Sequence, residues 1–153
     1  MYTEQLTQRL ALANGIAPQT LNKARRSSDG IDMQASRRAI FVLSLGANAG
    51  SINWYLQESA DNSTWTTNDT AGAFSGSGGT NTSATGLTAA NKEYTVECRD
   101  EDLTAGKRYV RLQIKETNVG VANVAVVAFG DEAVHKPGKA NNAANVSTQS
   151  VVT

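Results

Sequence analysis

The feature that most constrains the fold of this chain is a side-chain period of two, repeated in several short segments. Ile52, Trp54 and Leu56 fall on one face of their segment, and residues 108–114 alternate in the same way. This period is typical of β-strands, whose successive side chains point to opposite faces of a sheet. Turns rich in glycine, serine and asparagine separate the segments, and no helical pattern suggests a parallel sheet. We therefore predict an all-β fold, an antiparallel β-sandwich.

The sandwich is expected to occupy residues 37–137. Residues 40–45 are apolar on both faces and predict a central strand. Residues 51–67 predict a hairpin, and residues 66–91, with few large apolar side chains, predict a long loop or weak edge strands. Further segments with strand patterns are 93–98, 108–114 and 119–129. The segment 119–129 is small, apolar and β-branched, and we interpret it as a buried strand.

Both ends of the chain are predicted to lie outside this core, with residues 1–36 as an N-terminal arm. Three apolar residues of the arm recur at a spacing of four: Tyr2, Leu6 and Leu10. This spacing predicts a short amphipathic helix over about 3–13. A helix of three turns is marginal in water, so its apolar stripe is expected to pack on another surface. Residues 138–153 hold one charged residue and predict an extended C-terminal tail.

The composition of these ends is the first indication of function. Chain ends of this kind fray unless other contacts hold them. The tail has little apolar surface to offset an ordering cost of about 1–2 kcal/mol per residue. We therefore expect both ends to contact other chains, as in an assembly whose many weak contacts add through multivalency. The alternative, that both ends fold back onto their own sandwich, stays open.

Charge and rare residues exclude several classes of protein. Lys plus Arg and Asp plus Glu both number 14, so a formal net charge of zero argues against a general nucleic-acid binder. One cysteine, Cys98, and one histidine, His135, exclude an intramolecular disulfide and a His/Cys zinc site. A catalytic set built on histidine would need His135, which lies where the predicted core ends. We expect no catalytic residues, no metal, no cofactor and no enzyme activity.

Cys98 itself lies at an alternating position of its strand and is interpreted as a small buried apolar residue. The first residues lack the basic and apolar regions of a signal peptide, and no run of about 18 apolar residues suggests a membrane span. The protein is therefore expected to be soluble and made in a cytoplasm.

Positive charge is concentrated between residues 23 and 38. The arginines of this segment are Arg25, Arg26, Arg37 and Arg38. Arginine binds carboxylates through two parallel hydrogen bonds, so these side chains could dock on an acidic protein surface. They could equally pair with the acidic loop 100–102 of the same chain. Contact with packaged nucleic acid is a third and less favoured interpretation.

Residues 59–65 resemble the Asp box of sialidase-type propellers, although the segment is one residue shorter and has Ser63 where glycine is usual. In this hairpin we expect Asp61 to cap the turn and Trp65 to pack beneath it. A carbohydrate-binding surface of Trp54, Tyr55 and Trp65 is an alternative. Trp54 and Tyr55 are neighbours on one strand, however, and are expected to point to opposite faces.

Three segments together resemble small virion proteins of tailed bacteriophages: Arg37–Val42, Leu56–Trp65 and Lys107–Arg111. The resemblance covers roughly residues 23–137. Proteins of this family are β-sandwiches of the head or tail and are often encoded with the major capsid protein. The resemblance implies no catalytic residues. The glycine-rich segment 68–86 and the C-terminal tail match no part of the family pattern.

We therefore interpret the chain as a capsid decoration (cement) protein, located on the capsid surface of the virion. Its expected partners are the major capsid protein and further copies of itself in a symmetric oligomer, with a trimer favoured; membrane binding is not expected. The residues expected to bind these partners are Tyr2, Leu6, Leu10, Arg25, Arg26, Arg37 and Arg38. The alternatives are a tail or head–tail joining subunit, and a module that binds carbohydrate or the host surface.

Overall fold

The computed structural model describes residues 10–48, 50–66, 83–88, 90–117 and 120–133. These residues form nine β-strands and one short 3₁₀ turn. The strands are β1 (Ala11–Leu21), β2 (Arg25–Ser27), β3 (Ile31–Asp32), β4 (Ser36–Asn48), β5 (Ile52–Ser59), β6 (Ser83–Leu87), β7 (Lys92–Arg99), β8 (Tyr109–Glu116) and β9 (Ala122–Ala133), and the turn η1 is Asp100–Asp102.

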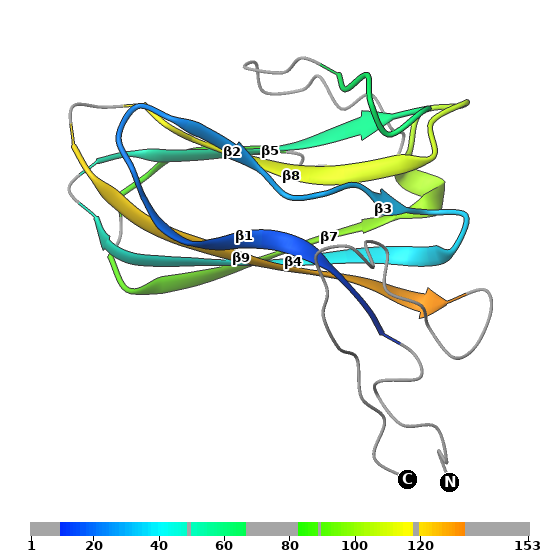
Figure 1. Ribbon diagram of the computed structural model, residues 1–153, viewed down its shortest axis with the longest axis horizontal. Helices are drawn as coiled ribbons and strands as arrows, with labels where there is room; N and C mark the ends of the chain where they lie inside the picture. The colour runs from blue at the N-terminus through cyan, green and yellow to red at the C-terminus, as the bar shows by residue number, and fades with distance from the viewer. Residues whose placement is uncertain (1–9, 49, 67–82, 89, 118–119, 134–153) are drawn as a thin grey trace, which may run out of the picture.

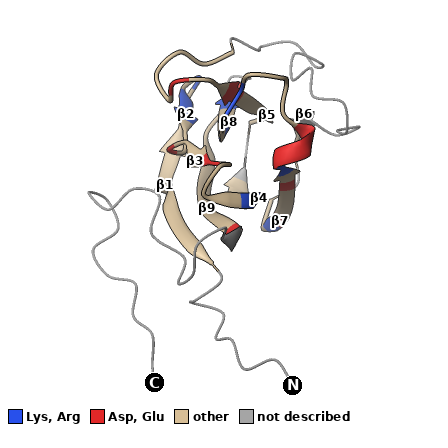
Figure 2. Cartoon of the chain, turned by 90° about the vertical axis from the view of Figure 1, so that its right-hand side faces the viewer, with Lys and Arg blue, Asp and Glu red and all other residues tan. Residues whose placement is uncertain are grey.

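The strands form two antiparallel sheets, which lie one above the other in Figure 1 and are seen from one end in Figure 2. The first sheet has the order β1-β9-β4-β7. The second has the order β2-β8-β5-β6, with β3 also paired to β8. The chain is therefore an antiparallel all-β protein, as the side-chain period predicts. No helix in the described part of the chain is long and apolar enough to cross a membrane.

One cluster of buried hydrophobic side chains draws on both sheets. It includes Phe41 and Val126 from the first sheet and Leu56 and Leu112 from the second. β4 pairs with β9 on one side and with β7 on the other, so the prediction of a central strand at 40–45 is confirmed. Each large side chain buried in such a cluster stabilises the fold by about 1.5–3 kcal/mol.

The helix predicted over 3–13 is wrong for residues 11–13, which belong to β1; residues 1–9 lie outside the described part of the chain. Ala11 pairs with Gly130 and Ala13 with Ala128, and both alanine side chains are buried. Pairing with β9 supplies partners for the backbone and buries one face of the strand, whereas a short helix would gain little by itself. Tertiary pairing therefore overrides the local spacing of apolar residues.

The described part of the predicted N-terminal arm, residues 10–36, is built into both sheets. β1 is an edge strand of the first sheet, and the chain then crosses to β2 and β3 of the second through Lys23, whose φ is 51°. Ile16, Ile31 and Met33 belong to the hydrophobic cluster. The predicted C-terminal tail, 138–153, lies outside the described residues.

The hairpin predicted over 51–67 is correct in its first strand and its turn. After β5 the chain turns back, and the Thr66 amide donates to the Glu58 carbonyl oxygen over 3.1 Å. The two strands that pair with β5 are β6 and β8. The prediction of a buried strand at 119–129 is correct for one face of β9 only, because Val127 is 44% exposed on the other face.

Candidate partner-binding surface

The residues predicted to bind partners do not form one patch. Tyr2 and Leu6 lie outside the described residues, and Leu10, just before β1, is half-buried. The four arginines are divided between the two sheets. Arg25 and Arg26 lie on β2, and Arg37 and Arg38 lie on β4.

The two arginine pairs also lie at opposite ends of the sheets. Arg25 is opposite Lys115 of β8, which is opposite Asn53 at the start of β5. Asp32 lies four residues before the start of β4. It pairs with β8 at a position that is opposite Ser59, at the other end of β5. These two positions of β5 are six steps apart along the strand, which corresponds to about 20 Å. The positive charge of the sequence segment 23–38 is therefore divided between two separate places in the structure, one at each end of the sheets.

On β2 both arginines are exposed, and the side chain of Arg26 also forms hydrogen bonds within the protein. Its Nε donates to Gln19 Oε1 of β1 over 3.0 Å, and one terminal nitrogen donates to the Arg25 carbonyl oxygen over 2.8 Å. The bond to Gln19 links β2 of the second sheet to β1 of the first. Arg26 therefore has a structural contact in addition to its exposed surface.

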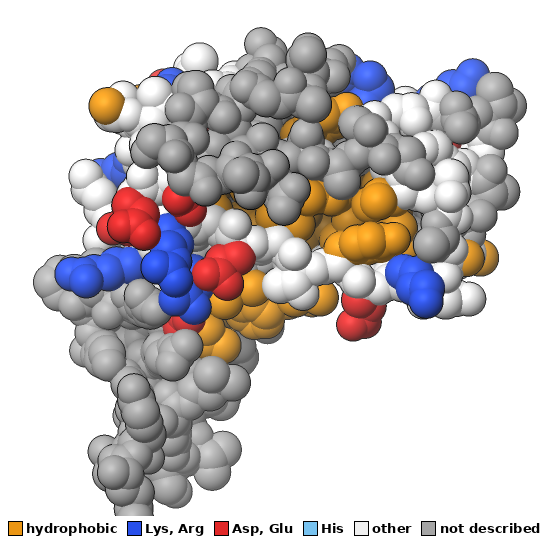
Figure 3. Space-filling model, turned by 180° about the vertical axis from the view of Figure 1, so that it is seen from behind, with side chains coloured by type: hydrophobic (Ala, Val, Ile, Leu, Met, Phe, Trp, Pro, Cys, Tyr) orange, Lys and Arg blue, Asp and Glu red, His pale blue; other side chains and the backbone are white. Residues whose placement is uncertain are grey.

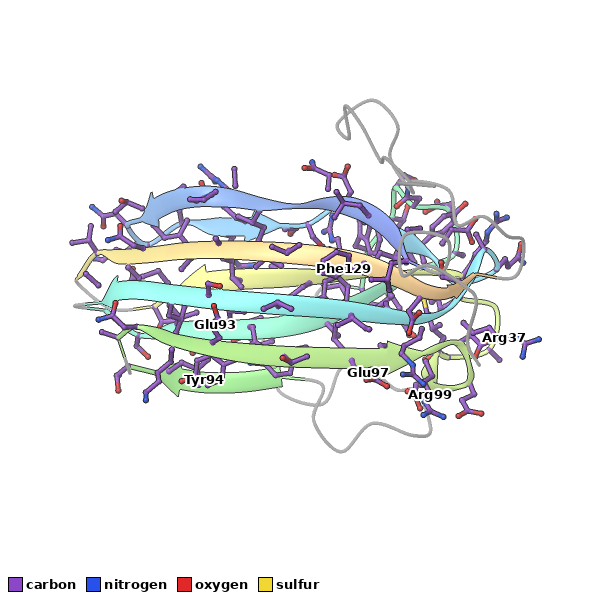
Figure 4. All side chains as sticks on the ribbon, turned by 90° about the horizontal axis from the view of Figure 1, so that it is seen from below. Arg37, Glu93, Tyr94, Glu97, Arg99 and Phe129 are labelled. Atoms are coloured by element: carbon purple, nitrogen blue, oxygen red, sulfur yellow. The ribbon has the colours of Figure 1, made fainter. Side chains whose placement is uncertain are left out.

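On the first sheet, charges of both signs gather where β4 begins and β7 ends, and we call this group the charged end. Its members are Arg37, Arg38, Glu97, Arg99, Glu101 and Asp131. Figure 4 places Arg37, Glu97 and Arg99 near one end of the sheet, and Figure 3 shows adjacent positive and negative side chains at that end.

Within the charged end, Arg38 lies between two carboxylates. Its Nε is 3.3 Å from Glu97 Oε1, and a terminal nitrogen is 4.0 Å from Asp131 Oδ2, on a side chain that is buried. Arg99 lies 3.9 Å from Glu97 and 3.6 Å from Glu101. Exposed ion pairs such as those of Arg99 are worth about 0–1 kcal/mol, so a partner can compete for them. Arg37 is exposed.

Next to the charged end, the outward face of the first sheet is apolar. We call this face the outer stripe; its residues are Leu12, Ile40, Val42, Val127 and Phe129. In register, Phe129 lies between Leu12 and Ile40, and Val127 lies opposite Val42. All but the exposed Val127 are half-buried. The sequence carries a signal for this stripe, because 40–45 is apolar on both faces, although a central strand by itself accounts for the same pattern.

Two buried carboxylates hold loops and were missed by sequence reasoning. Glu58 Oε2 accepts the Thr104 amide over 3.0 Å, and Glu116 Oε2 accepts the Lys23 amide over 2.7 Å. Both side chains are about 1% exposed. A pattern could have found them, since each continues the apolar face of its strand: Glu58 follows Leu56, and Glu116 follows Ile114. Their bonds to backbone amides give them a structural role.

The turn after β5 is formed as predicted. Asp61 Oδ1 accepts the amides of Ser63 and Thr64 over 2.9 and 2.7 Å and the Ser59 hydroxyl over 2.9 Å. These hydrogen bonds, the Thr64 amide first, hold the pKa of Asp61 far below its ordinary value. Asn62 has a φ of 59°, a conformation that asparagine tolerates in turns. Asp61 therefore caps this turn.

The three aromatic rings considered for carbohydrate binding do not form one platform. Trp54 belongs to the hydrophobic cluster, while Tyr55 points to the other face of β5 and is buried there. The guanidinium of Arg111 lies over the Trp65 ring, 4.2 Å from its centroid, and Arg111 Nε donates to Gln57 Oε1 over 2.8 Å. One face of the Trp65 ring is therefore already occupied.

Cys98 is buried, as predicted, and burial raises the pKa of its thiol to about 12. His135 lies outside the described residues. Among the residues that the structure describes, no group of three or more His, Cys, Asp or Glu side chains could hold a metal ion. No protein-family model matches the chain, and a search of curated proteins finds no match.

Proposed function

We propose that this protein is a structural protein of a bacteriophage virion, a capsid decoration protein that binds the assembled head and stabilises it. The two sheets, in this proposal, form the β-sandwich typical of the family that residues 37–42, 56–65 and 107–111 resemble. The major capsid protein is the proposed partner. The protein itself acts through binding, with no catalytic step.

The observation that carries the proposal is the outer stripe. An antiparallel sheet whose outer face meets only water usually has polar side chains at alternate positions of that face. Here Ile40 and Val42 lie beside Phe129 and Val127 on adjacent strands. A contiguous apolar patch with charges at its border is typical of a surface that binds another protein. The charged end supplies that border, and its exposed Arg37 supports binding to carboxylates on the shell.

The proposed oligomer is symmetric, so that one assembly bridges several capsid subunits. The trimer favoured by the sequence stays a prediction. Residues 1–9 and 138–153 are proposed to bridge neighbouring subunits. A deletion that tests the N-terminal residues has to stop before Ala11, because β1 is part of the first sheet.

The test is binding to empty heads assembled from the major capsid protein encoded in the same genome. Heads are sedimented with wild-type protein and with Val42→Asp and Val127→Asp, which place a charge on two paired positions of the stripe. We expect each variant to lower the affinity about tenfold or more, as loss of a central interface residue does. The control is Ala60→Asp, which adds the same charge at an exposed position in the turn after β5.

Heads that bind no wild-type protein, or that bind both stripe variants as well as the control, contradict the proposal. Imaging of the intact particle distinguishes the related alternative, because density at the tail or at the head–tail joint identifies a tail or joining subunit. Binding to a glycan array that is lost in Trp65→Ala identifies a carbohydrate-binding module instead.

A further inference from the structure

β7 is an unusually regular edge strand. It pairs with β4 at eight consecutive positions without a register shift. Within the described residues β4 is its one partner, and β7 forms the border of the first sheet in Figure 4. The opposite edge strand, β1, has two register shifts and contains Pro18. Shifts and prolines protect an edge from pairing with another chain, and β7 has neither.

The backbone direction of β7 follows from its last residue. The Arg99 amide donates to Asp102 Oδ2 over 2.9 Å, so this N–H points away from β4. In an antiparallel pair, residues alternate between those whose N–H and C=O both face the partner and those whose groups both face away. The backbone groups of Glu93, Thr95 and Glu97 therefore also face away from β4, toward the open side.

The side chains of β7 alternate in the same way. Glu93, Thr95, Glu97 and Arg99 are exposed on the outward face, whereas Val96 and Cys98 are buried. A second strand that pairs with this edge has to keep its own outward residues on that face, because a shift of one residue exchanges the two faces. When β7 pairs with the β7 of a second copy, outward residues therefore have to lie opposite outward residues. This leaves registers in which the centre of symmetry falls on a single residue of the strand.

Overlap and charge together select one of these registers, since centres at Tyr94 and Cys98 pair only residues 92–96 and 97–99 of the strand. In the register centred on Thr95, Glu93 is opposite Glu97 of the other copy. In the register centred on Glu97, that residue is opposite the same residue of the other copy. Both registers place like charges directly across from each other. In the register centred on Val96, Glu93 is opposite the partner's Arg99, and Thr95 is opposite the partner's Glu97. Opposite charges directly across two strands are favourable, and like charges are not.

Arg99 is available for such a contact. Its side chain is 53% exposed, and its neighbours Glu97 and Glu101 are 45% and 72% exposed. The distances of 3.9 and 3.6 Å describe weak surface pairs that can be exchanged for an equivalent pair across the interface.

We propose that two copies of this chain associate by antiparallel pairing of their β7 strands about Val96, with Glu93 of each copy opposite Arg99 of the other. This contact is two-fold and gives a dimer instead of the trimer that the sequence favours. The inference rests on the β7 edge alone and not on the proposed virion role, so each can fail without the other.

The test uses charge reversal in the full chain, with mass measured by analytical ultracentrifugation. The Glu93→Arg variant alone places an arginine at position 93 opposite Arg99 of the other copy, at both symmetric positions. The Arg99→Glu variant alone places two glutamates opposite each other in the same way. We expect each single variant to dimerise about 10- to 100-fold more weakly than wild type. An equimolar mixture of the two restores both opposite-charge pairs and is expected to form a heterodimer. The double variant is expected to form a homodimer.

A backbone variant tests the hydrogen bonds separately. Thr95→Pro removes an N–H that faces away from β4, so it is expected to abolish the dimer and leave the β4–β7 ladder intact. Thr95→Val keeps the N–H and is the matched control. Circular dichroism establishes that each variant is folded. A monomeric wild type at several hundred micromolar, a trimer as the sole oligomer, or single charge reversals that dimerise like wild type would each overturn the proposal.

Discussion

The size of the stability loss caused by Gly15→Ala distinguishes a free N-terminal arm from a strand of the sheet. Gly15 lies in β1, between two residues where the register with β9 shifts. A Cβ atom at this position would overlap the Val126 carbonyl oxygen and lie 2.8 Å from the Val126 carbonyl carbon and 3.2 Å from the Val127 Cα. All three atoms are backbone, so no change of side-chain rotamer relieves the overlap.

The two arrangements predict different results. In a free arm, replacing glycine by alanine would leave the stability nearly unchanged, because the residue is equally unconstrained in the folded and the unfolded chain. In the observed strand, the overlap forces β1 and β9 apart, and we expect a loss of about 2–3 kcal/mol. With a urea m-value of about 2 kcal/mol/M, the unfolding midpoint falls by about 1–1.5 M.

Urea unfolding followed by tryptophan fluorescence measures this change. The control is Gly46→Ala in β4, where the new Cβ would lie 3.2 Å from the Asn123 Cβ and 3.7 Å from its carbonyl oxygen, a contact that a shift of a few tenths of an ångström relieves. Its expected effect is below about 1 kcal/mol. If Gly15→Ala unfolds at the same urea concentration as wild type, or at a higher one, β1 does not pack on β9 as described.

The remaining predictions concern two buried or paired groups. In native protein, Cys98 is expected to resist a thiol reagent that labels it at once after denaturation, because burial raises the pKa of the thiol to about 12. Asp32→Asn is expected to lower the urea midpoint at pH 7. The hydrogen bonds from Arg108 hold the pKa of Asp32 below its ordinary value of 3.8, so the stabilisation is full above that pH and is lost as the pH falls through the lower, folded value. Urea midpoints of wild type and variant are therefore expected to converge in acid.

The parts of the fold that could be predicted are those whose cause is local. β4, β5, β7 and β8 each have a side-chain period of two over about eight or more residues, and a single stretch of sequence reveals it. The Asp61 turn is equally local, since its acceptor and the amides that it binds lie within three residues. The burial of Cys98 follows from the same alternation within β7.

The parts that could not be predicted depend on partners far along the chain. β2 and β3 have three and two residues, too few for any period, and both exist because β8 pairs with them. β1 is paired with residues more than 100 positions away, such as Ala11 with Gly130. The separation of the four arginines follows from this crossing between sheets, which no local pattern reveals.

The same long-range pairing links the two proposed surfaces. Glu97 is opposite Ile40 in the first sheet, so the β7 edge borders directly on the outer stripe. A two-fold pairing of β7 strands continues the sheet without exchanging its faces, and it therefore places the outer stripes of both copies on the same side. A dimer would then bind a lattice through two sites at once. Avidity of this kind raises affinity by about 10²–10⁴ without a new contact.

This link gives a last prediction, which applies if both proposals hold. Glu93→Arg leaves every residue of the outer stripe unchanged, yet it is expected to lower head occupancy by at least about tenfold, because the monomer has a single stripe. Adding an equal amount of Arg99→Glu is expected to restore occupancy together with the dimer. Ultracentrifugation and head sedimentation of the same samples measure both quantities. If occupancy stays at the wild-type level while the dimer is lost, the stripe binds the head as a single site, and pairing of β7 serves another purpose.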